Sequence, residues 1–253
     1  MTRVLVWVVM AKPFLILQLR ADDIAADNEL NAFVRFGGLK PGDFERIRLE
    51  QAGVKNVNLD NYSGIIVGGG PSNVSDTFKS PEQIQFETDL YKLFDEIIAR
   101  DFPYLGACYG LGIFAQFLGA RVTKERYSES VGAVTVTLTD EGRHDALTKA
   151  LPESFRAFVG HKEAVQELPR DAVHLAQSDT CPVQMIRFRN NIYATQFHPE
   201  LDAEGLAVRI QVYKNAGYFP PEDARALIHS TQDEAVAVPM KILKRFVERY
   251  RVK

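Results

Sequence analysis

The stretch that decides the fold is residues 103–118, which read PYLGACYGLGIFAQFL. Its first part is a short apolar run typical of a buried strand, and its second part repeats apolar residues at helical spacing. Between the two stands Gly-x-Cys-x-Gly, with Cys108 at its centre. The central residue of such a strand-to-helix turn adopts a strained backbone conformation, and the glycines let neighbouring chain pass close by. The pattern predicts a nucleophile at Cys108, with the amides of the following helix favouring its thiolate.

The residues before this turn predict an open α/β sheet. Apolar runs at 14–19 and 65–67 suit buried parallel strands, and an alternating run at 44–49 suits an outer strand. Helices are expected over 24–36 and 81–100. The strand at 65–67 ends in Gly-Gly-Gly-Pro at 68–71, which by itself is equally consistent with an ordinary turn. Because ligands of open α/β sheets gather at this edge, the triplet also offers backbone amides to an anion.

After residue 119 the pattern changes to alternating β-branched segments, which predict an antiparallel or mixed extension of the same sheet. The segments are 131–138, 155–159, 173–176, 183–188 and 192–195, with a turn expected at 139–142. Helices are then expected over 206–213, 221–228 and 239–250. We therefore divide the chain into a main domain at 1–201, in which 1–13 is a possible N-terminal extension, and a helical C-terminal appendage at 202–253 packed on it. The appendage is free to cover a sheet edge, cap the active site or form the face of a homodimer, and these alternatives stay open.

Composition narrows the class of protein. The 253 residues carry a net charge of −3, which gives no electrostatic reason to expect nucleic acid or an anionic membrane as partner. The apolar run at 4–10 is too short to span a bilayer and has no cleavage site after it. Whether residues 1–9 are native or an upstream extension is left open. The chain has only two cysteines, which favours a reducing compartment, so we expect a cytoplasmic protein.

A cysteine nucleophile needs a base, and that base needs a group to orient it. Among the five histidines, His198 follows the predicted strand at 192–195 and so can lie at the same sheet edge as Cys108. Glu200, two residues further on, can orient the imidazole. The other candidates, His144, His174 and His229, are most simply surface or structural residues.

Three sequence blocks, Gly-Gly-Gly-Pro at 68–71, Gly-Ala-Cys-Tyr-Gly at 106–110 and Gln-Phe-His-Pro-Glu at 196–200, resemble those of class I (triad-type) glutamine amidotransferases in the same order. The nearest likeness is to the glutaminase domain of GMP synthetase and its stand-alone relatives, over about residues 14–201. The resemblance implies a flavodoxin-like α/β domain, with a mostly parallel central sheet. It also implies hydrolysis of the γ-amide of glutamine through a γ-glutamyl thioester, without a metal or another cofactor.

The resemblance also assigns roles to individual residues. It makes Cys108 the nucleophile, His198 the general base and then acid, and Glu200 the residue that fixes the imidazole. The expected oxyanion and substrate site consists of Gly69, Gly70, Tyr109 and His161, with the backbone amides of Gly70 and Tyr109 as oxyanion donors. Cys181 is interpreted as structural.

Two departures from the family pattern concern the substrate. Gly112 stands where the family commonly has a glutamine that helps to hold the substrate, and Lys162 and Glu163 follow His161 in a block that is commonly Asn-His-Gly. For Lys162, a solvated charge and a contact with a substrate carboxylate remain equal alternatives.

The departures leave three functions open. One is a glutaminase that feeds ammonia to a separate ATP-dependent synthetase, since nothing in this sequence resembles an ATP-pyrophosphatase loop. The second is a γ-glutamyl peptidase that needs no partner, which Gly112 and Lys162 slightly favour. The third is a catalytically silent binding module of the same fold, which the intact triad argues against.

Overall fold

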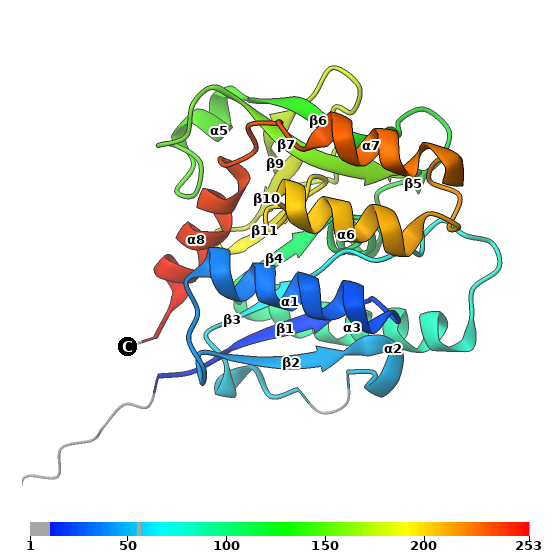
Figure 1. Ribbon diagram of the computed structural model, residues 1–253. Coiled ribbons are helices and arrows are strands. Elements are labelled where there is room, and N and C mark those ends of the chain that lie inside the picture. The colour runs from blue at the N-terminus through cyan, green and yellow to red at the C-terminus, as the bar shows by residue number, and fades with distance from the viewer. Residues whose placement is uncertain (1–10, 55–56, 253) are drawn as a thin grey trace, which may run out of the picture.

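A nine-stranded sheet organises the computed structural model, which describes residues 11–54 and 57–252 (Figure 1). Its strand order is β2-β1-β3-β4-β11-β10-β9-β6-β7. The first five strands in this order run parallel: β2 (Phe44–Arg48), β1 (Phe14–Gln18), β3 (Gly64–Val67), β4 (Tyr104–Ala107) and β11 (Ile192–Thr195). Because parallel strands share one carboxyl edge, the segments that follow β3, β4 and β11 meet there.

The other half of the sheet is antiparallel, as the alternating sequence pattern predicts. It consists of β10 (Met185–Phe188), β9 (Ala172–Gln177), β6 (Glu129–Leu138) and β7 (Ser154–His161). A separate two-stranded sheet pairs β5 (Val122–Thr123) with β8 (Ala164–Val165). The predicted α/β class, with a mostly parallel sheet and an antiparallel extension, is confirmed.

Helices cover both faces of the parallel half. One face packs against α1 (Asp23–Gly37) and α8 (Pro239–Tyr250), and Phe14 and Ile16 of β1 point into that core. The other face packs against α3 (Pro81–Arg100) and α4 (Tyr109–Phe117), and Leu15 and Leu17 of β1 point into that core. This burial on both sides explains the unbroken apolar run of β1. Ser80 caps α3 by accepting a hydrogen bond from the Gln83 N–H.

The C-terminal helices are integral to these layers. Helix α6 (Ala203–Tyr213) packs beside α1, and α7 (Ala224–Thr231) contacts α6 (Figure 1). In α8, Ile242 and Phe246 are fully buried in the same core as Phe14. The division at residue 201 stays a prediction, but the segment after it completes the core and, as shown below, the active site.

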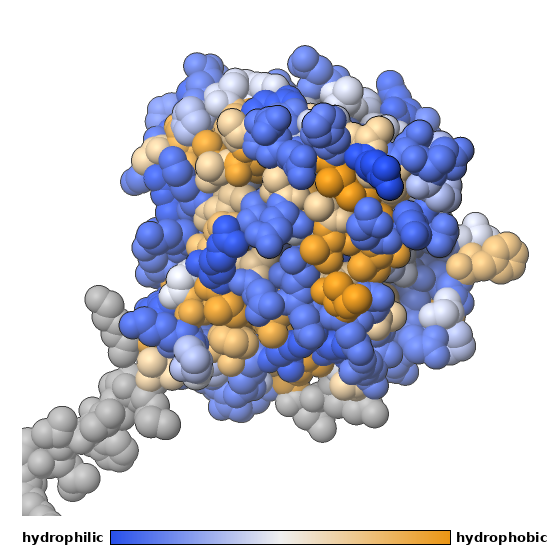
Figure 2. All heavy atoms as spheres, viewed as in Figure 1, coloured by the Kyte–Doolittle hydropathy of each residue, from blue (hydrophilic) through white to orange (hydrophobic). Residues whose placement is uncertain are grey.

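Apolar side chains also reach the surface over these helices. Figure 2 shows hydrophobic patches over the region of α1, α6 and α7, where a shallow apolar groove lies. Its apolar lining consists of Ile24, Ala207, Val208, Val212 and Ile228. The predicted homodimer stays a prediction.

Smaller elements complete the chain and include one correction. Residues 139–142, predicted as a turn, lead into the one-turn helix α5 (Asp140–His144), because the Thr139 side chain accepts the Gly142 N–H and caps it. Further short elements are α2 (Leu49–Ala52) and 3₁₀ turns at Leu59–Asn61 and Pro221–Asp223. The alternatives for residues 1–9 lie outside the described residues. Within the described ranges, none of the helices combines the length and apolarity needed to cross a bilayer.

Candidate active site

Cys108 occupies the sharp turn between β4 and α4. Its backbone has φ 51° and ψ −98°, a conformation that is rare for a residue with a side chain. The Cys108 N–H donates to the Thr195 carbonyl at 2.7 Å, which ties the turn to the end of β11. A Cβ atom at Gly106 would lie 2.8 Å from the Gly110 carbonyl carbon, so the chain can close this turn only with glycine at 106. The elbow predicted from the sequence is thus present.

His198 and Glu200 lie at the same edge of the sheet. They follow β11, which pairs in parallel with β4. His198 Nδ1 lies 2.9 Å from Glu200 Oε1, and both side chains are buried. The glycine turn packs closely against both His198 and Cys108, since a Cβ atom at Gly69 would lie 2.6 Å from His198 Cε1 and 3.4 Å from Cys108 Cβ. The structure therefore brings together the three residues predicted to form the triad, with the glycine turn against them.

The electrostatics of Cys108 differ from the expectation of a stable thiolate. Burial raises the pKa of the Cys108 thiol to about 12, and the carboxylates of Glu163 and Glu200 add to this, while Arg20 and Arg209 oppose it. Burial also lowers the pKa of His198. Both groups are therefore neutral at rest near pH 7, so the thiol needs His198 as a base at the moment of attack.

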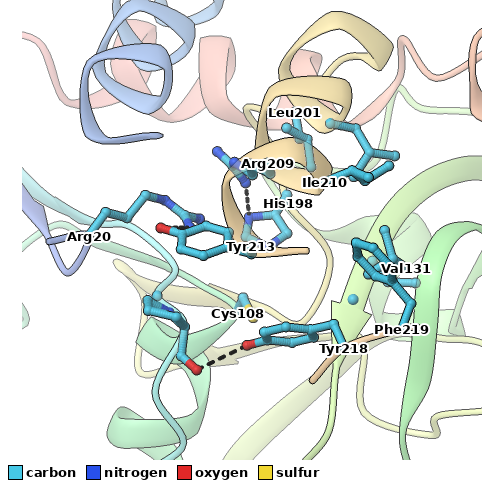
Figure 3. Close-up of a pocket in the computed structure, with 15 residues that line it drawn as sticks. Arg20, Cys108, Val131, His198, Leu201, Arg209, Ile210, Tyr213, Tyr218 and Phe219 are labelled. Carbon is cyan, nitrogen blue, oxygen red and sulfur yellow. Dashed lines mark hydrogen bonds between the residues drawn. The ribbon is translucent and has the colours of Figure 1, made fainter. Parts of the chain in front are cut away.

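Arg209 is a further member of the site, which it enters from α6. Its Nη2 donates to Glu200 Oε1 at 2.8 Å, and its Nη1 lies 3.0 Å from His198 Nδ1 (Figure 3). Burial by itself raises the pKa of Glu200, but the interactions of its carboxylate with His198 and Arg209 outweigh burial and hold that pKa well below its ordinary value. Glu200 is thus ionised, and in the tautomer whose Nδ1 donates to Glu200 the basic nitrogen of His198 is Nε2.

A second buried ion pair supports the first. Arg20 donates from Nε to Glu29 Oε1 at 2.8 Å, and Gln18 donates to the other carboxylate oxygen of Glu29 at 2.9 Å. Arg209 Nη2 lies 3.6 Å from Glu29, so Arg209 stands between two carboxylates. In this network, the positive charges of Arg20 and Arg209 balance the negative charges of Glu29 and Glu200.

Two pockets meet at Cys108. The first, here called the apolar pocket, contains His198 and is shown in Figure 3, where Arg20 and Val131 approach Cys108 from opposite sides. Its apolar lining is Val131, Val159, Leu201, Leu206, Ile210 and Phe219. The second, here called the polar pocket, is lined by Ser72, Asn73, Tyr109, Gly112, His161, Glu163 and Gln196, among others. Cys108 and Gly70 line both pockets.

In the polar pocket, a carboxylate lies near the position where the family has glutamine. Glu163 accepts the N–H groups of Val74 at 2.7 Å and Ser75 at 2.9 Å. A Cβ atom at Gly112 would lie 3.7 Å from Glu163 Oε1. His161 also lines this pocket, but its Nε2 pairs with Glu129 at 2.8 Å and its Nδ1 with the Glu163 carbonyl at 2.8 Å. Its role as a substrate-binding residue stays a prediction.

Lys162 contacts the segment that follows α6. Its Nζ donates to the Ala216 carbonyl at 2.8 Å and lies 4.2 Å from the centre of the Tyr218 ring. The Tyr218 hydroxyl in turn donates to the Pro71 carbonyl at 3.1 Å. Lys162 therefore anchors this segment, and the two alternatives weighed for its charge stay open.

Among the described residues, one cluster has the composition of a metal site. Ligand atoms of Glu129, His161 and Cys181 all lie within 4.8 Å of one another. Glu129 also accepts hydrogen bonds from Ser178, Thr180 and Gln184, so its carboxylate is already satisfied by the protein. The arrangement is that of a buried polar network in which Cys181 is a structural neighbour.

Comparisons with known proteins show the family of the chain. The profile of the family "Glutamine amidotransferase class-I" matches residues 43–207. The chain belongs to the class-I glutamine amidotransferase family. One subunit of the glutamine-hydrolysing GMP synthase of Pyrococcus abyssi is 30% identical over 149 residues, which cover 58% of this chain and 71% of that protein. The glutamine-hydrolysing GMP synthase of Petrotoga mobilis is 31% identical over 147 residues, but the chain spans only 26% of its length.

Solved structures share the fold. A glutamine amidotransferase from Thermotoga maritima superposes with a TM-score of 0.73 and 22% identity, over 94% of this chain and 97% of that one. Another, from Methylobacillus flagellatus, gives 0.70 and 18% identity over 96% of both chains. This chain is therefore an enzyme of the class-I amidotransferase type with the flavodoxin-like fold of that class.

Proposed function

We propose that the chain hydrolyses a γ-glutamyl amide, with glutamine as the first substrate to test, through a γ-glutamyl thioester on Cys108. The observation that carries this proposal is the convergence of the strained Cys108 elbow with the buried His198–Glu200 pair. His198 Nε2 takes the proton of the thiol as the sulfur attacks the amide carbon. It then gives that proton to the departing amine, and water activated by His198 releases glutamate.

The negative charge of the tetrahedral intermediate needs preorganised donors. We assign this role to the backbone N–H groups of Gly70 and Tyr109. Both residues line the polar pocket beside Cys108. Within the described parts of the chain, neither N–H has a hydrogen-bond acceptor in the protein, so both are free to bind an oxyanion. Because these donors belong to the backbone, truncating the Tyr109 side chain leaves the oxyanion site itself in place.

A separate ATP-dependent synthetase is the proposed partner if ammonia is the product that matters. The support is the similarity to one subunit of the Pyrococcus abyssi GMP synthase. The second candidate is a γ-glutamyl peptidase that works alone, which the absence of a glutamine side chain at Gly112 favours. Both cysteines are free, which fits the cytoplasmic location that we propose.

The test is release of glutamate from glutamine and from a panel of γ-glutamyl compounds by the purified chain. We expect turnover by the wild type and none by Cys108→Ala. Turnover of glutamine that rises when a synthetase is added supports the partner, while turnover of γ-glutamyl dipeptides alone supports the peptidase. If no compound is hydrolysed and a glutamine-like diazoketone does not label Cys108, the proposal fails and a silent binding module takes its place.

A further inference from the structure

We propose that the apolar pocket binds the amine half of the substrate and that this amine carries an apolar substituent. The substrate class would be γ-glutamyl amides of primary amines with a branched alkyl or aryl chain. The inference rests on the proposed hydrolysis of a γ-glutamyl amide and names the leaving group of that reaction.

The chemistry decides which half of the substrate enters which pocket. The departing nitrogen must receive its proton from His198, so the amine lies on the side of Cys108 where His198 is. His198 lines the apolar pocket. The carbonyl oxygen must face the oxyanion donor at Tyr109, which lines the polar pocket together with Gly112. The glutamyl half therefore occupies the polar pocket and the amine occupies the apolar one.

The apolar pocket is larger than the space that ammonia needs, and its lining is less polar than a site for ammonia requires. Val131, Leu206 and Phe219 are among the apolar side chains that surround it beside the rings of Tyr213 and Tyr218. Ammonia makes no favourable contact with such a surface, whereas an alkyl or aryl substituent gains from leaving water there. The pocket is thus matched to the amine of a substituted amide.

The charges in the apolar pocket disfavour an amine that carries a carboxylate. Its two cations are Arg20 and Arg209. Arg20 is paired with Glu29 at 2.8 Å, and Arg209 with Glu200 at 2.8 Å. A carboxylate on the leaving amine would have to compete with these buried partners and would leave one of them uncompensated. An uncharged substituent meets no such cost.

The segment after residue 201 contributes six of the fifteen residues that line the pocket. Leu206 and Ile210 come from α6, and Phe219 comes from the loop that follows it. That loop is held in place by the bond from the Tyr218 hydroxyl to the Pro71 carbonyl and by Lys162. The C-terminal segment therefore defines the amine specificity, while the central sheet supplies the chemistry.

The first experiment compares three substrates in the wild-type enzyme: L-γ-glutamyl-isoamylamide, L-γ-glutamyl-L-leucine and L-glutamine. The first two differ only by the α-carboxylate of leucine, and the third lacks the substituent. We expect kcat/KM to be highest for the isoamylamide, by at least about tenfold over each of the others. In every case the C–N bond breaks, water supplies the hydroxyl of glutamate, and the amine leaves with the proton from His198.

The other outcomes are distinguishable. If glutamine is hydrolysed best, the inference is overturned while the proposed hydrolysis stands. If γ-glutamyl-leucine is hydrolysed best, the amine carries a carboxylate and the assignment of an uncharged amine is wrong. If none of the three is hydrolysed, the inference falls together with the proposed function.

Substitutions in the apolar pocket then test whether its side chains cause the preference for the isoamylamide over glutamine. Phe219→Ala should lower kcat/KM for the isoamylamide about tenfold more than it lowers that for glutamine. The matched control is Phe78→Ala, because Phe78 is 95% exposed and should leave both values unchanged. Val131→Asp, at a partly exposed position of β6, should have the same selective effect as Phe219→Ala. This variant replaces Phe219→Ala in the test if Phe219→Ala does not fold. An equal loss for both substrates in both pocket variants would overturn the assignment.

Discussion

Arg209 on α6 donates a hydrogen bond of 2.8 Å to Glu200, the carboxylate that also contacts His198. A helix from the C-terminal segment therefore completes the triad that the central sheet begins. Because Glu200 is fully buried, its charge needs this cation as well as the imidazole. Arg209 acts through His198 and Glu200 and is thus a positioning residue.

Replacing Arg209 should change the pH profile of the reaction. Burial lowers the pKa of His198 and Arg209 lowers it further, so Arg209→Met should raise it. Since His198 must be neutral to act as a base, the loss of kcat/KM on acidification should begin at higher pH in the variant. Misplacement of the imidazole should also lower kcat/KM roughly a hundredfold. The control is Arg35→Met, which breaks the exposed pair with Asp202. An acid limb that does not move would refute this role.

The Cys108 thiol should react slowly with a general alkylating agent. Its pKa is raised to about 12 by burial, so little thiolate exists near neutral pH. In a Cys181→Ser background, alkylation by iodoacetamide at pH 7.5 should be slower than that of free cysteine, and its rate should rise about tenfold per pH unit. Rapid alkylation that is independent of pH above 7 would instead mean that the helix amides hold a stable thiolate.

Two glycines around the nucleophile should respond oppositely to alanine. A Cβ atom at Gly106 would lie 2.6 Å from the Tyr104 hydroxyl oxygen and close to Gly110, so Gly106→Ala should lower the free energy of unfolding by about 1–3 kcal/mol. Gly112 lies inside α4, and its nearest neighbour would be 3.5 Å away, so Gly112→Ala should raise that free energy by about 0.5–1 kcal/mol. Urea unfolding monitored by circular dichroism measures both. Changes of the same sign would contradict this account of the turn.

The buried carboxylate of Glu129 should make stability depend on pH. Burial raises its pKa, but hydrogen bonds from His161, Thr180 and Ser178 outweigh burial and lower the pKa below the ordinary 4.5. The stabilisation is therefore present above pH 4.5 and is lost as pH falls through the lower folded-state value. Glu129→Gln should be less stable at pH 7 by about 1–3 kcal/mol and should lose less stability than the wild type on acidification. Parallel curves for the two proteins would exclude this network as the source.

Local patterns in the sequence predict the fold and the central residues of the site. Gly-x-Cys-x-Gly and the apolar runs are set by backbone sterics and by burial on both faces of a sheet, which act over a few residues. Arg209, in contrast, looks like an ordinary charge on a surface helix, and its contact with Glu200 depends on how α6 packs. One signal was available: Glu29 lies on the same helical face as Ala25 and Phe33, and a carboxylate on a buried face requires a cationic partner.

The lining of the apolar pocket was also beyond sequence reasoning. Phe219 follows α6 in a short loop, which the Tyr218–Pro71 bond and the contacts of Lys162 hold over the cleft. Such contacts join residues far apart in the chain and leave no periodic pattern. The altered substrate site that Gly112 indicates stays a prediction, and Glu163 lies near the space that a side chain there would enter.

The central claim is that Cys108 carries the glutamyl group during turnover. The most direct measurement is rapid acid quenching of the enzyme during hydrolysis of a γ-glutamyl amide, followed by mass spectrometry of the peptide that contains Cys108. We predict that this peptide gains the mass of one γ-glutamyl group in the wild type and that Cys108→Ala shows neither the adduct nor turnover. Sustained turnover by Cys108→Ala, with no adduct in the wild type, would contradict the account.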